Sequence, residues 1–182
     1  MLNQIDIDVL KRDSDSWNRW RQAHPGVRPD LKKALLQKLC LRDVDLSGSL
    51  LREADLSDTN LSGADLRRAD LSEAALTWAY MCKANLSFAR LGQADLSGAD
   101  LSEATLRGAD LQGACLIGAY LINTDLRDAN LKDADLRGAV LINARLSGAD
   151  LSGARLDKAR FIGRVPLADI ISPPPELAGS AH

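Results

Sequence analysis

Residues 94–98 read Ala94-Asp95-Leu96-Ser97-Gly98, and variants of this five-residue pattern fill most of the chain. From Leu41 to Phe161 every fifth residue is apolar, which gives 25 central positions in register, 23 of them leucine. A period of five fits neither an α-helix, which repeats every ~3.6 residues, nor a strand, which alternates every ~2. The chain is therefore a repeat array, and we expect all 25 central residues to be buried between neighbouring repeats.

Each repeat also has a second apolar position, two residues before the central one, and this is alanine in 20 of the 25 repeats. Both residues share one face of a short extended segment, so a turn must follow before the next alanine. The second turn residue is glycine in 10 of the 25 repeats, and glycine tolerates positive φ. Other repeats carry larger residues there, which favours a second type of turn. Examples are Asp58, Glu73, Glu103 and Lys158.

The residue just before the central one is Asp or Asn in 13 of the 25 repeats. Short polar side chains of this kind accept hydrogen bonds from the backbone of a following turn. We therefore expect these side chains to be structural. The alternative is an array of functional carboxylates.

The repeated pattern Ala-(Asp/Asn)-Leu-x-Gly resembles that of the pentapeptide-repeat proteins, and the match covers about three quarters of the chain. The lead-in Trp17-Asn18-Arg19-Trp20-Arg21 is similar to that of cyanobacterial members. The resemblance implies an all-β solenoid, a right-handed quadrilateral β-helix with four repeats per coil. The 25 repeats would then form about six coils.

A solenoid exposes its core and unpaired backbone at both ends, so it requires caps. Residues 4–23 have a helical pattern that ends before Pro25, and Trp17 and Trp20 are predicted to cover the open core. The alternative is that the two tryptophans form a binding site. The predicted domains are a helical cap over 1–28, the solenoid over 29–165 and a proline-rich tail over 166–182.

No pattern in the sequence indicates catalysis. The only two histidines, His24 and His182, lie outside the array, so the array offers no Ser/His/Asp or Cys/His constellation. The three cysteines lack metal-ligand spacing and are expected to stay unpaired; they are Cys40, Cys82 and Cys115. We predict no catalytic, metal-binding or cofactor-binding residues, and we do not expect an enzyme.

Charge and hydropathy limit the classes of partner. With 23 basic and 25 acidic residues the net charge is −2, which argues against a nucleic-acid partner and a polybasic membrane anchor. No apolar run is long enough to span a membrane. Residues 1–8 lack the basic and apolar regions of a signal peptide, so a cytoplasmic location is the expectation.

Four repeats per coil would stack residues 20 apart on the same side of the solenoid. One side then gathers large apolar residues, whereas the other sides carry mainly Ser, Arg, Lys and Asp. We call this set the apolar face: Trp78 at its corner, with Tyr80, Tyr120, Ile122, Val140, Ile142 and Ile162. Such a surface is usually covered. The candidates are the chain's own tail, through Leu167, Ile170 and Ile171, a second copy in a homodimer, or a protein partner.

Two functions follow from this sequence. The first is a non-enzymatic structural and protein-interaction module that presents the apolar face to a protein partner. The second comes from the resemblance, because some family members mimic duplex DNA and protect gyrase, a type II topoisomerase. Mimicry requires a strongly negative rod. Residues 41–161 carry 18 acidic and 14 basic residues, a net charge of −4, which is a weak field.

Overall fold

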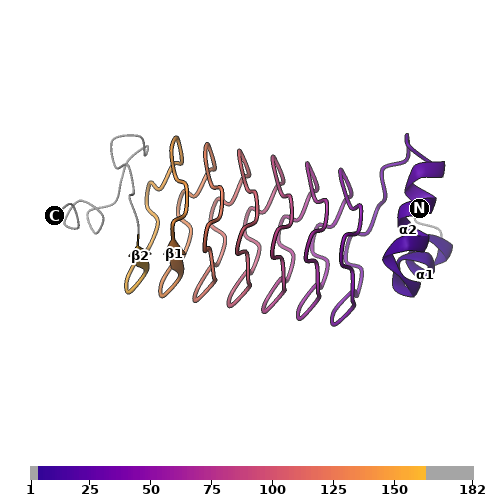
Figure 1. The fold of residues 1–182 in the computed structure, drawn as a ribbon, viewed down its shortest axis with the longest axis horizontal. Helices are drawn as coiled ribbons and strands as arrows, with labels where there is room; N and C mark the ends of the chain where they lie inside the picture. Colours follow the sequence, from indigo (N-terminus) through magenta and orange to yellow (C-terminus); the bar gives the residue numbers. More distant parts are fainter. Residues whose placement is uncertain (1–3, 163–182) are drawn as a thin grey trace.

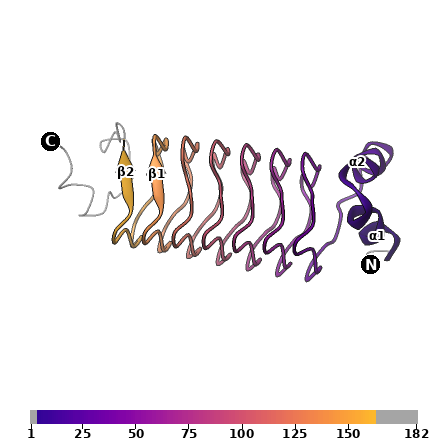
Figure 2. The same cartoon turned by 60° about the horizontal axis from the view of Figure 1, so that its bottom comes forward.

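A computed structural model describes residues 4–162 (Figure 1). Two helices, α1 (Gln4–Arg12) and α2 (Ser14–Ala23), lie at one end of a rod of stacked coils, as both views show (Figures 1 and 2). The last two described coils contain short strands, β1 (Val140–Ile142) and β2 (Arg160–Ile162). The predicted tail over 166–182, one of the three candidates to cover the apolar face, lies outside the described residues.

The coil contains 20 residues, which is four repeats. Parallel bridges join residues 20 apart, from Asp30↔Leu50 to Asp135↔Arg155, and β1 pairs with β2 in the same register. Residues 30–149 thus form six coils and 150–162 part of a seventh. Leu31 and Leu36 are also fully buried, so the array includes two repeats ahead of Leu41.

The core is a column of leucine and alanine. The central residues from Leu41 to Leu156 are all buried, and the alanines that precede them pack in the same core. The exception among the 25 is Phe161, which is only partly buried, so the expectation of complete burial was wrong at this position. Phe161 belongs to the last described coil, where no further described coil packs over it.

The described turns of the solenoid share one backbone feature at their second residue. The second turn residue has a positive φ, between 53° and 73°, at all 26 positions from Lys33 to Lys158, and 17 of these residues are not glycine. The expected second turn type was therefore wrong: Glu73 has φ 59° and Gly98 has φ 67°. Their amides donate to the next coil in the same way, to Gly92 O at 2.9 Å and Ile117 O at 2.9 Å. A non-glycine residue in the left-handed conformation loses about 1–2 kcal/mol of local conformational free energy. The hydrogen bonds and packing between stacked coils outweigh this cost.

The Asp and Asn residues before the central position support these turns, as predicted. All 13 accept a hydrogen bond from the backbone amide two residues later, as Asp95 Oδ1 does from Ser97 N at 3.0 Å. This is the local side chain-to-backbone bond that Asp and Asn favour in turns.

The N-terminal segment is divided into two helices rather than one. The break falls at Asp13, whose extended backbone and side chain form the N-cap of α2; its Oδ1 accepts from Ser16 N at 2.6 Å. A carboxylate at an N-cap satisfies an amide that has no partner within the helix, which explains why the helical run is interrupted there.

Candidate protein-interaction face

The stacking of coils gathers the residues of the apolar face into two columns. Tyr80, Tyr120 and Val140 lie in one column, in which Asp100 pairs with both tyrosines. Ile142 and Ile162 pair in the other column, to which Ile122 also belongs because Asn123 N donates to Ile142 O. Between the columns runs the buried row that contains Met81, Leu121 and Leu141.

Several of these side chains are well exposed. The exposed fractions are 63% for Trp78, 56% for Tyr80, 46% for Tyr120 and 53% for Ile162. The side chains between them are half-buried, namely Ile122, Val140 and Ile142. The apolar face thus runs without a polar residue through Tyr120, Ile122, Val140 and Ile142, whereas Asp100 and Ser102 separate Tyr80 from this part.

A groove of about 320 Å³ lies at the start of this face. Its apolar walls come from Trp78, Tyr80, Tyr120 and Ile122. Gly98 also lines it, and Asp100 and Ser102 supply polar groups. The groove can therefore accept an apolar side chain and place a hydrogen-bond donor beside a carboxylate.

Asp100, which lines the groove, is hydrogen-bonded to a cysteine of the preceding coil. Cys82 Sγ donates to Asp100 Oδ2 at 3.1 Å. Burial, with Asp100 as the second cause, raises the pKa of the Cys82 thiol to about 11. Burial alone would raise the pKa of Asp100, but hydrogen bonds from Ser102 and Cys82 outweigh it and hold that pKa below its ordinary value. The groove is thus lined by an ionised carboxylate, that of Asp100, which accepts a hydrogen bond from the neutral Cys82 thiol at neutral pH.

The two tryptophans of α2 lie on the first coil. Trp17 is fully buried and its Nε1 donates to Asp45 O at 2.7 Å. Trp20 stacks on Trp17 with ring centroids 5.0 Å apart, and on the other side it stacks on His24 at 4.8 Å. Trp20 is partly buried against the core.

Asn18 forms hydrogen bonds to the first coil through both the nitrogen and the oxygen of its side-chain amide. No separate role was assigned to it from the sequence. Its Nδ2 donates to Asp43 O at 2.9 Å and its Oδ1 accepts from Asp45 N at 2.8 Å. In later coils the equivalent amide donates to the preceding coil, as Asp65 N does to Val44 O. The first coil has no preceding coil, so Asn18 supplies the acceptor. Only its place beside Trp17 could have indicated this role.

Other types of site are not evident in the described part of the chain. Residues 4–162 contain no group of three or more His, Cys, Asp and Glu side chains arranged to hold a metal ion. No helix within the same range is long and apolar enough to cross a membrane. The three cysteines are free, as predicted.

The sequence of the chain matches a known protein family. The family model for pentapeptide repeats matches residues 49–87, 84–128 and 124–163, with eight copies of its unit. No curated protein matches the chain.

Solved structures of pentapeptide repeat proteins also align with the chain. Trypsin-treated QnrB1, a plasmid-mediated fluoroquinolone resistance protein, shares 19% identity over 79% of this chain and 74% of its own, with a TM-score of 0.48. HetL, involved in heterocyst differentiation regulation in the cyanobacterium Nostoc sp. strain PCC 7120, shares 29% over 78% and 92%, with a TM-score of 0.32. Rfr23 from the cyanobacterium Cyanothece 51142 shares 25% over 85% and 96%, with a TM-score of 0.33.

The family match covers well over half of the chain, and the 20-residue coil runs through the matched residues up to Ile162. The fold is a right-handed quadrilateral β-helix with helices at its N-terminal end, and the chain belongs to the pentapeptide repeat family.

Proposed function

We propose that this protein is a non-enzymatic interaction module that binds a protein partner through its apolar face. The observation that supports this most directly is the pair of surface columns on successive coils, with the exposed Tyr120 beside the half-buried Ile122, and Val140 beside Ile142, both half-buried. Contiguous aromatic and β-branched side chains on a surface usually mark an area that another molecule covers.

The groove suggests the chemistry of the partner. An apolar side chain of the partner would enter between Trp78, Tyr80 and Tyr120, because exposed aromatic rings provide large contact areas. A cation or amide of the same segment would lie on Asp100. Since the coils form a stacked rod, binding would require little reorganisation of the face.

The test uses the double variant Ile122→Lys with Ile142→Lys, which places two charges on the face. The matched control is Ser72→Lys with Gln112→Lys, which places two charges at the same repeat position on the opposite side of the rod. The partner is captured from an extract of the source cell. We expect capture by the parent and the control, and loss with the Ile122/Ile142 variant at unchanged thermal stability.

The competing occupants give different results in purified protein. A homodimer would show twice the monomer mass by light scattering, and the Ile122/Ile142 variant would abolish it. If the tail covers the face, a chain that ends at Val165 would associate or bind an apolar dye more strongly than the parent. Equal capture by the parent and both double variants, with strong dye binding to the full chain, contradicts the proposal.

Duplex-DNA mimicry remains the alternative function, and the structure offers no observation in its favour. Several carboxylates of the rod are paired with arginines, as Asp125 is with Arg127 and Asp135 is with Arg137. Such pairs neutralise part of an already weak negative field. An interaction through the apolar face is therefore preferred.

A further inference from the structure

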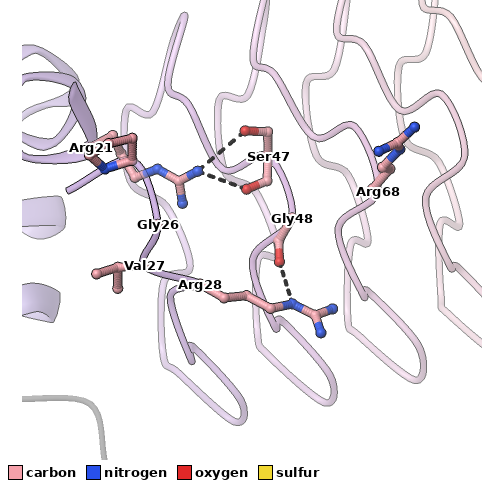
Figure 3. A pocket seen from close by; sticks show the side chains of 8 residues that line it. Arg21, Gly26, Val27, Arg28, Ser47, Gly48 and Arg68 are labelled. Carbon is pink, nitrogen blue, oxygen red and sulfur yellow. Dashed lines mark hydrogen bonds between the residues drawn. The ribbon is translucent and has the colours of Figure 1, made fainter.

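A second hollow, of about 340 Å³, lies where the N-terminal segment meets the solenoid, outside the apolar face (Figure 3). It is lined by Arg21 of α2, by the connection 25–28, by the turn Ser47-Gly48 of the first coil and by Arg68 of the second. No side chain fills the space over Gly26 or Gly48, where a Cβ would have no neighbour within 4 Å. Three arginines thus surround an open space.

Arg21 is the most buried of the three, with 11% of its side chain exposed. Its Nη2 donates to Ser47 O at 2.9 Å and to Ser47 Oγ at 3.3 Å. Its Nε and Nη1 are inaccessible to water and make no hydrogen bond with the described residues. Nε lies 3.5 Å from Asp45 Oδ2, so one carboxylate balances the charge of this guanidinium while two of its nitrogens lack a hydrogen bond.

Arg28 and Arg68 add two charges that are not balanced. Arg28 donates from Nε to Gly48 O at 2.7 Å, and the side chain of Arg68 makes no hydrogen bond in the described part of the chain. Neither forms an ion pair with a described carboxylate, whereas the neighbouring Arg67 is paired with Asp65. Figure 3 shows the side chains of Arg21 and Arg28 reaching the Ser47-Gly48 turn from two sides, with Arg68 one coil further along.

We propose that this hollow binds a phosphate group, either as the free anion or as a monoester. A planar guanidinium donates paired hydrogen bonds that match the oxygens of phosphate. The two unbalanced charges equal the charge of a phosphate dianion, and the ligand would also lie close to the buried Arg21. The volume of about 340 Å³ leaves room for the group that carries a monoester.

The experiment titrates inorganic phosphate and O-phosphoserine into the full chain at constant ionic strength. Amide chemical shifts of Gly26, Val27 and Gly48 report on occupancy, and chloride serves as the blank. The decisive variant is Arg68→Gln, because this side chain has no bond within the described fold to lose. The control is Lys38→Gln, which removes one positive charge from the same turn position at the diagonally opposite corner.

We expect saturable binding to one site, about tenfold weaker in Arg68→Gln and unchanged in Lys38→Gln, because only the first variant removes a charge-assisted hydrogen bond to the ligand; a factor of ten is ~1.4 kcal/mol. Tighter binding of O-phosphoserine than of phosphate identifies a monoester as the ligand, and the reverse order identifies the free anion. Chemical-shift changes that do not saturate would indicate ionic screening rather than binding, and so would an equal loss of affinity in Arg68→Gln and Lys38→Gln. Either result overturns the proposal. Parent-like binding by Arg68→Gln overturns it as well.

Discussion

The indole ring of Trp78 lies against Gly98, one coil further along the same corner of the solenoid. A Cβ on Gly98 would fall 2.6 Å from two carbons of this ring. Phe88 lies against Gly108 in the same manner, at 2.7 Å. A large side chain at a turn thus packs where the next coil has no side chain, and this packing shapes the groove of the apolar face.

Gly98→Ala is expected to move the Trp78 ring and to reshape the groove. Gly138→Ala is the matched control, because Gly138 lies on the same corner with the same φ of 67° but has no neighbour within 4 Å of a Cβ. Both variants should lose about 1 kcal/mol for a left-handed alanine, and Gly98→Ala a further ~1–3 kcal/mol for overpacking. Thermal or urea unfolding measures the difference; equal losses would contradict the packing of Trp78 on Gly98.

Two hydroxyl groups in the alanine column are expected to respond in opposite directions. Ser49 is buried and its Oγ has no hydrogen-bond partner among the described residues, whereas Thr124 Oγ1 donates to Leu101 O at 2.8 Å. Ser49→Ala should therefore increase the free energy of unfolding by about 1 kcal/mol, and Thr124→Val should lower it by a similar amount. Urea denaturation of both variants checks the prediction, and a loss of stability in Ser49→Ala would contradict it.

Asn18→Ala should destabilise the contact between α2 and the first coil. The substitution leaves Asp45 N without its acceptor and removes the bond to Asp43 O, at a cost of about 1–3 kcal/mol. Gln22→Ala, at an exposed position of the same helix, is the control and should have little effect. Hydrogen exchange at the Asp45 amide should accelerate only in Asn18→Ala.

Stability should fall at acidic pH. The hydrogen bond from Arg127, against the opposing effect of burial, holds the pKa of Asp125 below its ordinary value of 3.8. A folded-state pKa below the unfolded one gives stability that is fully present above pH ~4 and is lost as pH falls through the folded pKa. Asp125→Asn should lower the melting temperature at pH 7 and flatten its decline below pH ~4. An unchanged acid profile would show that this ion pair does not contribute.

The thiol of Cys82 should react slowly with disulfide reagents. Its pKa is raised to about 11 by burial and by Asp100, so little thiolate forms at pH ~8. Cys40 is exposed and should be modified first. Asp100→Asn should accelerate modification of Cys82 in a Cys40→Ser background. Equal rates for Cys40 and Cys82 in the parent would contradict the assigned hydrogen bond.

The sequence by itself determined the five-residue repeat and its core positions, whereas four repeats per coil was what the family resemblance implied. A five-residue period with one large and one small apolar position can be buried continuously in only a few ways, and it identified Leu96 and Ala94 as core residues. It also predicted the Asp and Asn bonds, because these are made between residues two apart. With the four repeats per coil that the resemblance implied, the same register predicted that Tyr80 and Tyr120 share one column, because they are separated by a whole number of coils.

Only the tertiary structure determined two features that depend on residues distant in the sequence: the uniform left-handed turns and the hollow between α2 and the solenoid. Glu73 adopts a left-handed turn because its amide pairs with a carbonyl of the next coil, which local preference alone disfavours. Arg21 and Arg68 line one hollow because Arg21 of α2 bonds to Ser47 of the first coil and the second coil, with Arg68, stacks on the first. Pairing between coils and the docking of α2 are long-range properties, so a local pattern in the sequence could not specify them.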